Sequence, residues 1–251
     1  MQFQVLRKLI AVMLPILVAQ LSTVGMNFLD TAMAGHAGRE DLAGVSVGAS
    51  LFLPILVATT GVLAAATPMI AQLLGRKQEA GIPEVVRTGL YLGLVLSLLF
   101  AALYELTIDP VLAGMALEPE VERIARYYLL AMAGAVFFET PVMVLRSLTD
   151  TVGGTSISMR FFLLGLPVDA FLNWLFIFGN WGVPRMGGIG AGIATLITYA
   201  FLLVLFLAVV LREKKFRGRE IFGSWGTRLP VWRGIPGDGV GETRGGVFGR
   251  G

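Results

Sequence analysis

The sequence predicts an all-α integral membrane protein with six transmembrane helices, and three observations support this fold class. The chain of 251 residues is 55% hydrophobic and only 15% charged, whereas a soluble domain carries about 25% charged residues. Six charge-poor windows follow one another along the chain, and about 20 apolar residues are enough to cross a ~30 Å hydrocarbon core. Lysine and arginine gather on alternate connections between these windows, as expected for helices that cross a membrane in turn.

The predicted spans cover about residues 9–34, 42–75, 88–104, 127–145, 161–179 and 186–211. Together with their short connections they form a six-helix transmembrane lobe over residues 1–219. Prolines 15, 54, 68, 141 and 167 fall within these spans, and proline kinks a helix because it lacks a backbone donor. Residues 220–251 are rich in glycine and arginine and have no apolar periodicity, which predicts a disordered cytoplasmic tail.

The distribution of basic residues predicts the orientation of the chain. If the N-terminus is cytoplasmic, the cytoplasmic segments before the tail hold twelve Lys and Arg residues and the opposite loops hold four. An excess of Lys and Arg in short cytoplasmic loops is the usual bias. Six spans also place both termini on one side. We therefore expect a multi-pass protein of the cell inner membrane with both termini in the cytoplasm.

Composition also excludes several kinds of site. The chain has no cysteine and a single histidine, His36, which rules out thiolate chemistry and a histidine-rich metal site. No nucleophile–base arrangement and no phosphate-binding glycine motif are visible, because "GGIGAGIAT" lacks the strand that a dinucleotide turn follows. A channel is disfavoured because no filter-like loop repeats. We therefore expect neither an enzyme nor a nucleic-acid-binding protein, and no cofactor.

Three acidic residues lie inside the predicted spans, namely Asp30, Glu139 and Asp169. No Lys or Arg lies in the same spans to pair with them. A charge at the bilayer centre costs about 2.5–3.5 kcal/mol even on the lenient insertion scale. These carboxyl groups should therefore face the protein interior or a wet cavity, where they hold a proton or bind a cation.

Each of these acids has a second interpretation that the sequence leaves open. Asp30 lies 21 residues after Leu9, or about 32 Å along a helix, so it fits the outer interface as well as a buried site. Glu139 could serve structurally by donating to carbonyls that Pro141 frees. Asp169 and Asn173 share a helix face at i and i+4, which suits either a Na⁺ site or an interhelical hydrogen bond.

Four separated stretches resemble the multidrug and toxic compound extrusion (MATE) family, and its bacterial branch in particular. They read "LPILVAQLSTVGMNFLDTAMAGHAG", "ATPMIAQLLGR", "LRSLTDTVGGT" and "LNWLFIFGNWGVPRMGGIGAGIAT", and the resemblance covers about residues 5–215. It implies a fold of twelve helices in two lobes, which expose a central cavity to either side in turn. It also implies an antiporter that exports cationic, amphipathic drugs in exchange for H⁺ or Na⁺.

The resemblance further implies which residues bind the coupling ion. Asp30 falls at the family's first-helix aspartate, which takes up the ion or proton. Asp169 and Asn173 fall at polar positions of the fifth helix, and Asp169 stands where an asparagine is usual. Thr195 lies near the hydroxyl position of the sixth helix. Na⁺ could therefore bind at Asp30, Asp169 and Asn173, and Glu139 is an additional polar position.

The resemblance stops after six helices, where a family member would continue into a second lobe. Activity would then need a second six-helix half or a second copy of the chain, in addition to the lipid bilayer and small cationic drugs as partners. The alternatives are an inactive truncated remnant and a non-transporting membrane scaffold.

Overall fold

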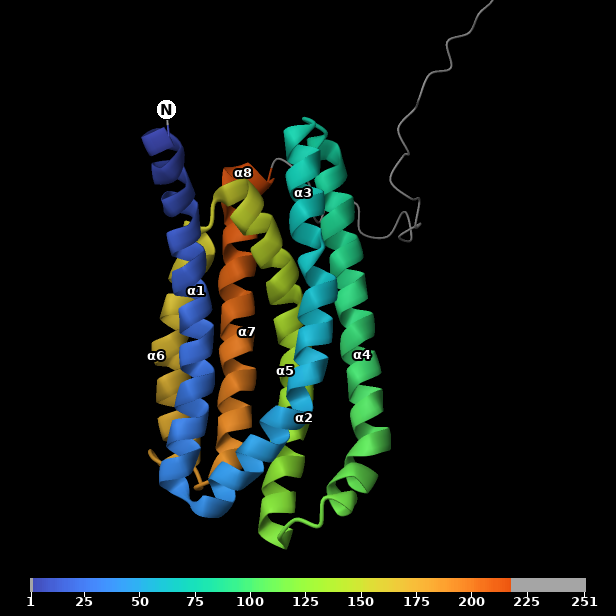
Figure 1. Ribbon diagram of the computed structural model, residues 1–251, viewed down its shortest axis with the longest axis vertical. Coiled ribbons are helices and arrows are strands. Elements are labelled where there is room, and N and C mark those ends of the chain that lie inside the picture. The colour runs from blue at the N-terminus through green and yellow to red at the C-terminus, as the bar shows by residue number, and fades with distance from the viewer. Residues whose placement is uncertain (1, 218–251) are drawn as a thin grey trace, which may run out of the picture.

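The computed structural model describes residues 2–217, which form an elongated bundle of α-helices with no strand in this part of the chain (Figure 1). The predicted tail over residues 220–251 lies outside the described residues. The α-helices are α1 (Gln2–Ala37), α2 (Arg39–Ala64), α3 (Ala66–Gly75), α4 (Ile82–Gly114), α5 (Pro119–Leu148), α6 (Ser156–Phe178), α7 (Gly188–Arg212) and α8 (Lys214–Arg217). A 3₁₀ turn, η1 (Glu79–Gly81), precedes α4, and a π-helical turn, η2 (Thr149–Gly153), follows α5.

The prediction of six membrane-spanning helices is confirmed. Within the described residues, six stretches are long and apolar enough to cross a membrane, namely Leu9–Ala37, Arg39–Gly75, Glu79–Gly114, Pro119–Gly153, Ser156–Phe178 and Gly188–Arg212. The N-terminus and α8 lie at the same end of the bundle (Figure 1), as an even number of crossings requires. The chain is therefore a multi-pass membrane protein.

The second span, expected over residues 42–75 with Pro54 and Pro68 inside it, is divided into α2 and α3 at Ala65. Pro68 explains the break. Its ring excludes a hydrogen bond to the carbonyl four residues earlier, that of Ala64. The Ala65 amide instead donates to the carbonyl of Val62, three residues back, at 3.3 Å, which tightens and ends α2.

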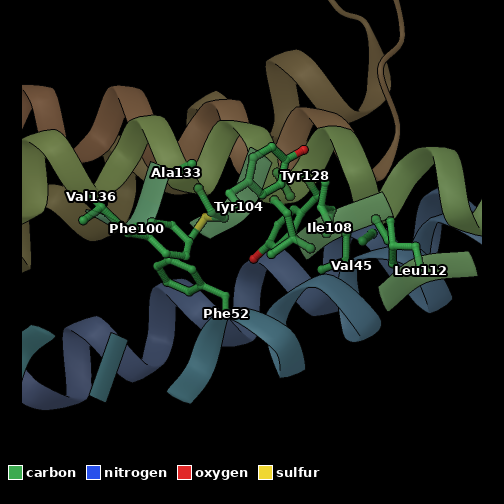
Figure 2. Packing of buried hydrophobic residues seen from close by; sticks show 14 of the residues in the cluster. Val45, Phe52, Phe100, Tyr104, Ile108, Leu112, Tyr128, Ala133 and Val136 are labelled. Carbon is green, nitrogen blue, oxygen red and sulfur yellow. The ribbon is translucent and has the colours of Figure 1, made fainter. Parts of the chain in front are cut away.

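Helix α5 lies in the middle of the bundle and packs against α2, α4 and α7. Figure 2 shows one of the two apolar clusters around it, in which Val45 and Phe52 of α2 face Phe100 of α4 and Tyr128 and Val136 of α5. The rings of Phe52 and Phe100 meet edge to face, with centroids 5.7 Å apart, a favourable geometry for aromatic pairs. This packing holds α5 between neighbours on both sides.

The glycines at the start of α7 let three helix backbones approach closely. A Cβ atom on Gly190 would lie 2.7 Å from the carbonyl carbon of Phe176 and 2.8 Å from the amide nitrogen of Ile177, both on α6. A Cβ on Gly192 would lie 3.1 Å from the carbonyl oxygen of Tyr128 on α5. Small residues at such contacts are how membrane helices pack tightly.

We expect Gly190→Ala to destabilise the bundle, because its new methyl group meets backbone atoms of α6 that no side-chain rotation can move away. Overpacking of this kind costs about 1–3 kcal/mol. Gly61→Ala on α2 is the matched control, since nothing lies within 4 Å of its added Cβ. Thermal unfolding in detergent should therefore show a lower midpoint for Gly190→Ala alone. Equal midpoints for the two variants would contradict the close approach of α6 and α7.

Candidate functional site

The structure brings Asp30, Asp169, Asn173 and Thr195 together at one buried position between three helices. Asp30 comes from α1, Asp169 and Asn173 from α6, and Thr195 from α7. The Asp30 residue is only 4% exposed and Asp169 only 1%. Both side chains are therefore enclosed by protein.

One amide group joins the two carboxylates. The Nδ2 atom of Asn173 donates to Oδ1 of Asp30 at 2.6 Å and to Oδ2 of Asp169 at 3.1 Å. An amide nitrogen carries two hydrogens, so it can serve both acceptors at once. Asn173 therefore binds α1 to α6 and also determines the separation of the two acids.

Two threonine hydroxyls of α7 complete the arrangement. Thr195 Oγ1 lies 3.1 Å from Oδ2 of Asp30, and Thr198 Oγ1 lies 3.1 Å from Oδ1 of Asp169. Each of the four carboxylate oxygens thus has one neutral donor. Sequence reasoning missed Thr198, although its position three residues after Thr195 places it on the same face of α7.

No cationic side chain in the described part of the chain pairs with either acid. The ion pairs found within residues 2–217 join Arg123, Arg126 and Arg146 to other acids, and none reaches Asp30 or Asp169. Two unit charges 4 Å apart repel by about 4 kcal/mol even at an effective dielectric constant of 20. Two ionised carboxylates that share one donor therefore favour the uptake of a positive charge.

The second polar atom of Asn173 faces no donor. Its Oδ1 atom is buried and has no hydrogen-bond partner among the described residues. Amide and carboxylate oxygens are the ligands that hard cations prefer. Within residues 2–217, no group of three or more His, Cys, Asp or Glu side chains could hold a metal ion. The oxygen atoms of the cluster are of the kind that binds a proton or a hard cation.

Glu139 is buried but separate from this cluster. It lies on α5 and is only 3% exposed. None of the hydrogen bonds found among the described residues joins its carboxyl group to the cluster of Asp30 and Asp169. Hydrogen bonds join four of the predicted site residues, namely Asp30, Asp169, Asn173 and Thr195. Glu139 is not part of this network.

Two contacts at the nearby end of the bundle hold the start of α7 and the end of α1, two of the helices that carry the cluster. The backbone amide of Gly188 donates to Oδ1 of Asp41 at 2.6 Å, which ties the first turn of α7 to that of α2. Arg185 Nη2 donates to the carbonyl oxygen of Ala37 at 2.6 Å, which ties the loop before α7 to the end of α1. Neither contact could be predicted from the sequence, because each joins residues almost 150 positions apart.

Comparison with known proteins identifies the family of the chain. Residues 15–175 match the family model MatE. A relative from Halalkalibacterium halodurans, named "Probable multidrug resistance protein NorM", is 40% identical over 227 residues, which are 90% of this chain and 50% of that protein. The protein of the same name from Oceanobacillus iheyensis is 41% identical over 213 residues, or 85% of this chain and 48% of that protein. The chain spans about half the length of these curated relatives.

Solved structures show the same fold. An outward-facing multidrug resistance MATE family transporter of the MOP superfamily superposes with a TM-score of 0.73 at 20% identity, over 81% of this chain and 44% of that chain. A MOP superfamily transporter from Pyrococcus furiosus gives a TM-score of 0.73 at 20% identity, over 84% of this chain and 45% of that chain. These relatives are transporters and not enzymes. The chain therefore belongs to the MatE family, and its six membrane helices have the fold of one half of a MATE transporter.

Proposed function

We propose that this chain is the ion-binding half of a cation-coupled multidrug antiporter, which exports cationic amphipathic compounds in exchange for H⁺ or Na⁺. The observation that carries the proposal is the buried pair of Asp30 and Asp169, which accepts four hydrogen bonds from three neutral side chains and has no cationic partner within residues 2–217. The name of the relatives, multidrug resistance protein, supports the substrate class.

The coupling follows from the cost of enclosing charge. With both carboxylates ionised, their negative charges repel each other, which favours a conformation in which water reaches them. A proton or Na⁺ removes one net negative charge and makes the enclosed form less costly. Because Asn173, Thr195 and Thr198 connect the acids of α1 and α6 to α7, occupancy of the site would change how tightly these helices close together. An ion that binds one arrangement better than another shifts the population between them.

The two coupling ions make different use of the same atoms. A proton would be held by the carboxylates themselves, with the hydroxyl and amide donors stabilising whichever acid stays ionised. Na⁺ would take oxygens from Asp30 and Asp169, and the partnerless Oδ1 of Asn173 would be a further ligand. Glu139 is a second buried acid that a proton would neutralise, since a buried carboxylate without donors is costly.

The proposal includes a partner and a location. The chain spans about half of its relatives, and alternating access requires one half of a transporter to move against the other. A second six-helix half, or a second copy of this chain, would supply the opposite wall of the drug cavity. Both termini would lie in the cytoplasm and the bundle in the cell inner membrane.

We expect Asp30→Asn to reduce binding of the coupling ion at least about tenfold, because it removes one of the two charges that attract the ion. Binding of radioactive Na⁺ to purified protein, and proton uptake after a pH step, measure this without requiring transport. Asp109→Asn is the matched control, because Asp109 lies on the bundle exterior, paired with Arg126 at 2.6 Å.

Efflux of ethidium from cells that express the chain, alone and with a second half, tests the transport function itself. Efflux should appear with the complete pair of halves and be lost in Asp30→Asn. Ion binding and efflux that are both undiminished in that variant would contradict the proposal. Ion binding without efflux in either arrangement would favour a remnant or scaffold.

We expect Thr198→Val to hold protons more tightly, because the hydroxyl stabilises the ionised form of Asp169. Loss of a hydrogen bond to a buried charged group costs about 1.5–3 kcal/mol, so the pH of half-maximal proton release should rise by about one unit or more. Thr198→Ser keeps the hydroxyl and should behave like the wild type. If the Val and Ser variants titrate alike, the Thr198 hydroxyl does not act on the site.

A further inference from the structure

Three aromatic rings gather on the outside of the bundle, where α6 ends. Phe171 and Trp174 lie in the last turns of α6, and Trp181 lies in the loop that follows. The ring centroids are 6.0 Å apart for Phe171 and Trp174, 5.6 Å for Phe171 and Trp181, and 6.1 Å for the two tryptophans. The rings nevertheless remain open to the outside, since Trp181 is 79% exposed and Trp174 39%.

The backbone folds back to bring Trp181 into this group. Gly179 ends α6 in the left-handed region with φ 73°, and Asn180 Nδ2 donates to the carbonyl oxygen of Trp174 at 2.9 Å. Trp181 itself has φ 55°, a conformation that is strained for a bulky residue and costs on the order of 1–3 kcal/mol. The loop thus holds Trp181 in an unfavourable conformation in which its ring touches α6.

Helix α6 has two faces of different character. One face turns Phe162, Asp169 and Asn173 into the bundle, whereas the opposite face exposes Leu163, Leu164, Phe171 and Trp174. Arg160 is exposed near the start of the helix. From Arg160 to the last helical residue, Phe178, the helix rises about 27 Å at 1.5 Å per residue. This length nearly matches a hydrocarbon core of ~30 Å.

The spacing of the rings distinguishes between two possible occupants of this surface. An aromatic cage for an organic cation needs open space between its rings, but centroids 5.6–6.1 Å apart belong to rings in direct contact. Tryptophan rings instead favour the membrane–water interface, where the apolar ring meets the acyl chains and the indole N–H stays among polar groups. Neither Trp174 nor Trp181 donates its indole N–H to any described residue, so both donors are free for lipid headgroups or water.

We propose that Phe171, Trp174 and Trp181 form an interfacial anchor that places this end of α6 at the headgroup boundary of the phospholipid bilayer. The exposed face of α6 then meets acyl chains rather than a second half of the transporter. Arg160 reaches the opposite boundary by extending its charged end toward the headgroups. Leu164, ten residues before Trp174, would lie about 15 Å deeper, near the bilayer centre.

Depth-dependent fluorescence quenching tests this anchor. The sequence contains four tryptophans, so Trp225→Phe and Trp232→Phe are combined with either Trp174→Phe or Trp181→Phe to leave one reporter on α6 or its loop. Leu164→Trp in a chain without other tryptophans supplies the matched deep reporter, since Leu164 is exposed on the same face. The variants are reconstituted in phosphatidylcholine vesicles brominated near the glycerol end, in the middle or near the methyl end of the acyl chains.

We expect bromine near the glycerol end to quench Trp174 and Trp181 at least about twofold more than bromine near the methyl end, and the order to be reversed for Leu164→Trp. Quenching of Trp181 by aqueous acrylamide alone would place the loop in water and overturn the anchor. Absence of quenching by any lipid would show that protein covers this face. Strongest quenching near the methyl end would place the rings too deep.

Discussion

The shared amide of Asn173 is the interaction on which the candidate site depends. Asp30 and Asp169 belong to different helices, and like charges in a medium of low dielectric would drive those helices apart. The side chain of Asn173 donates to both acids, at 2.6 and 3.1 Å. These two hydrogen bonds partly offset the repulsion between the acids. The close approach of α1, α6 and α7 is therefore both a condition for the cluster and a consequence of it, and the glycine at position 190 permits the α6–α7 contact sterically.

This arrangement remains only partly balanced, and the imbalance suits a site that exchanges an ion. Neutral donors spread the charge of a carboxylate but do not cancel it. A Lys or Arg in the same place would neutralise the pair permanently, and burial of a fixed ion pair would leave nothing to exchange. Threonine hydroxyls and one amide satisfy the oxygens of both acids without cancelling their charge, as the proposed exchange of one positive charge would require.

The sequence predicted the number of membrane helices and the acids inside them, because both depend on local hydropathy and on the high cost of buried charge. It could not show which helices meet, since spacing places Asp169 and Asn173 on one face of α6 but says nothing about the neighbour opposite. The resemblance to the MATE family supplied that pairing for Asp30 and Thr195. Thr198 was missed because a threonine on an apolar helix usually bonds its own backbone, and only the tertiary contact with Asp169 distinguishes it.

The two faces of α6 connect the membrane surface to the site. Asn173 points inward and the next residue, Trp174, points outward, so both lie at almost the same level along the helix. An anchor that holds Trp174 at the headgroup boundary therefore also sets the depth of Asp169, five residues earlier and about 7.5 Å further in. With the proposed anchor in place, the acids would be enclosed by protein yet lie within one to two helical turns of the headgroup boundary. A short path suits an ion that must leave and return, whereas the same cluster at the bilayer centre would face a larger desolvation cost in each exchange.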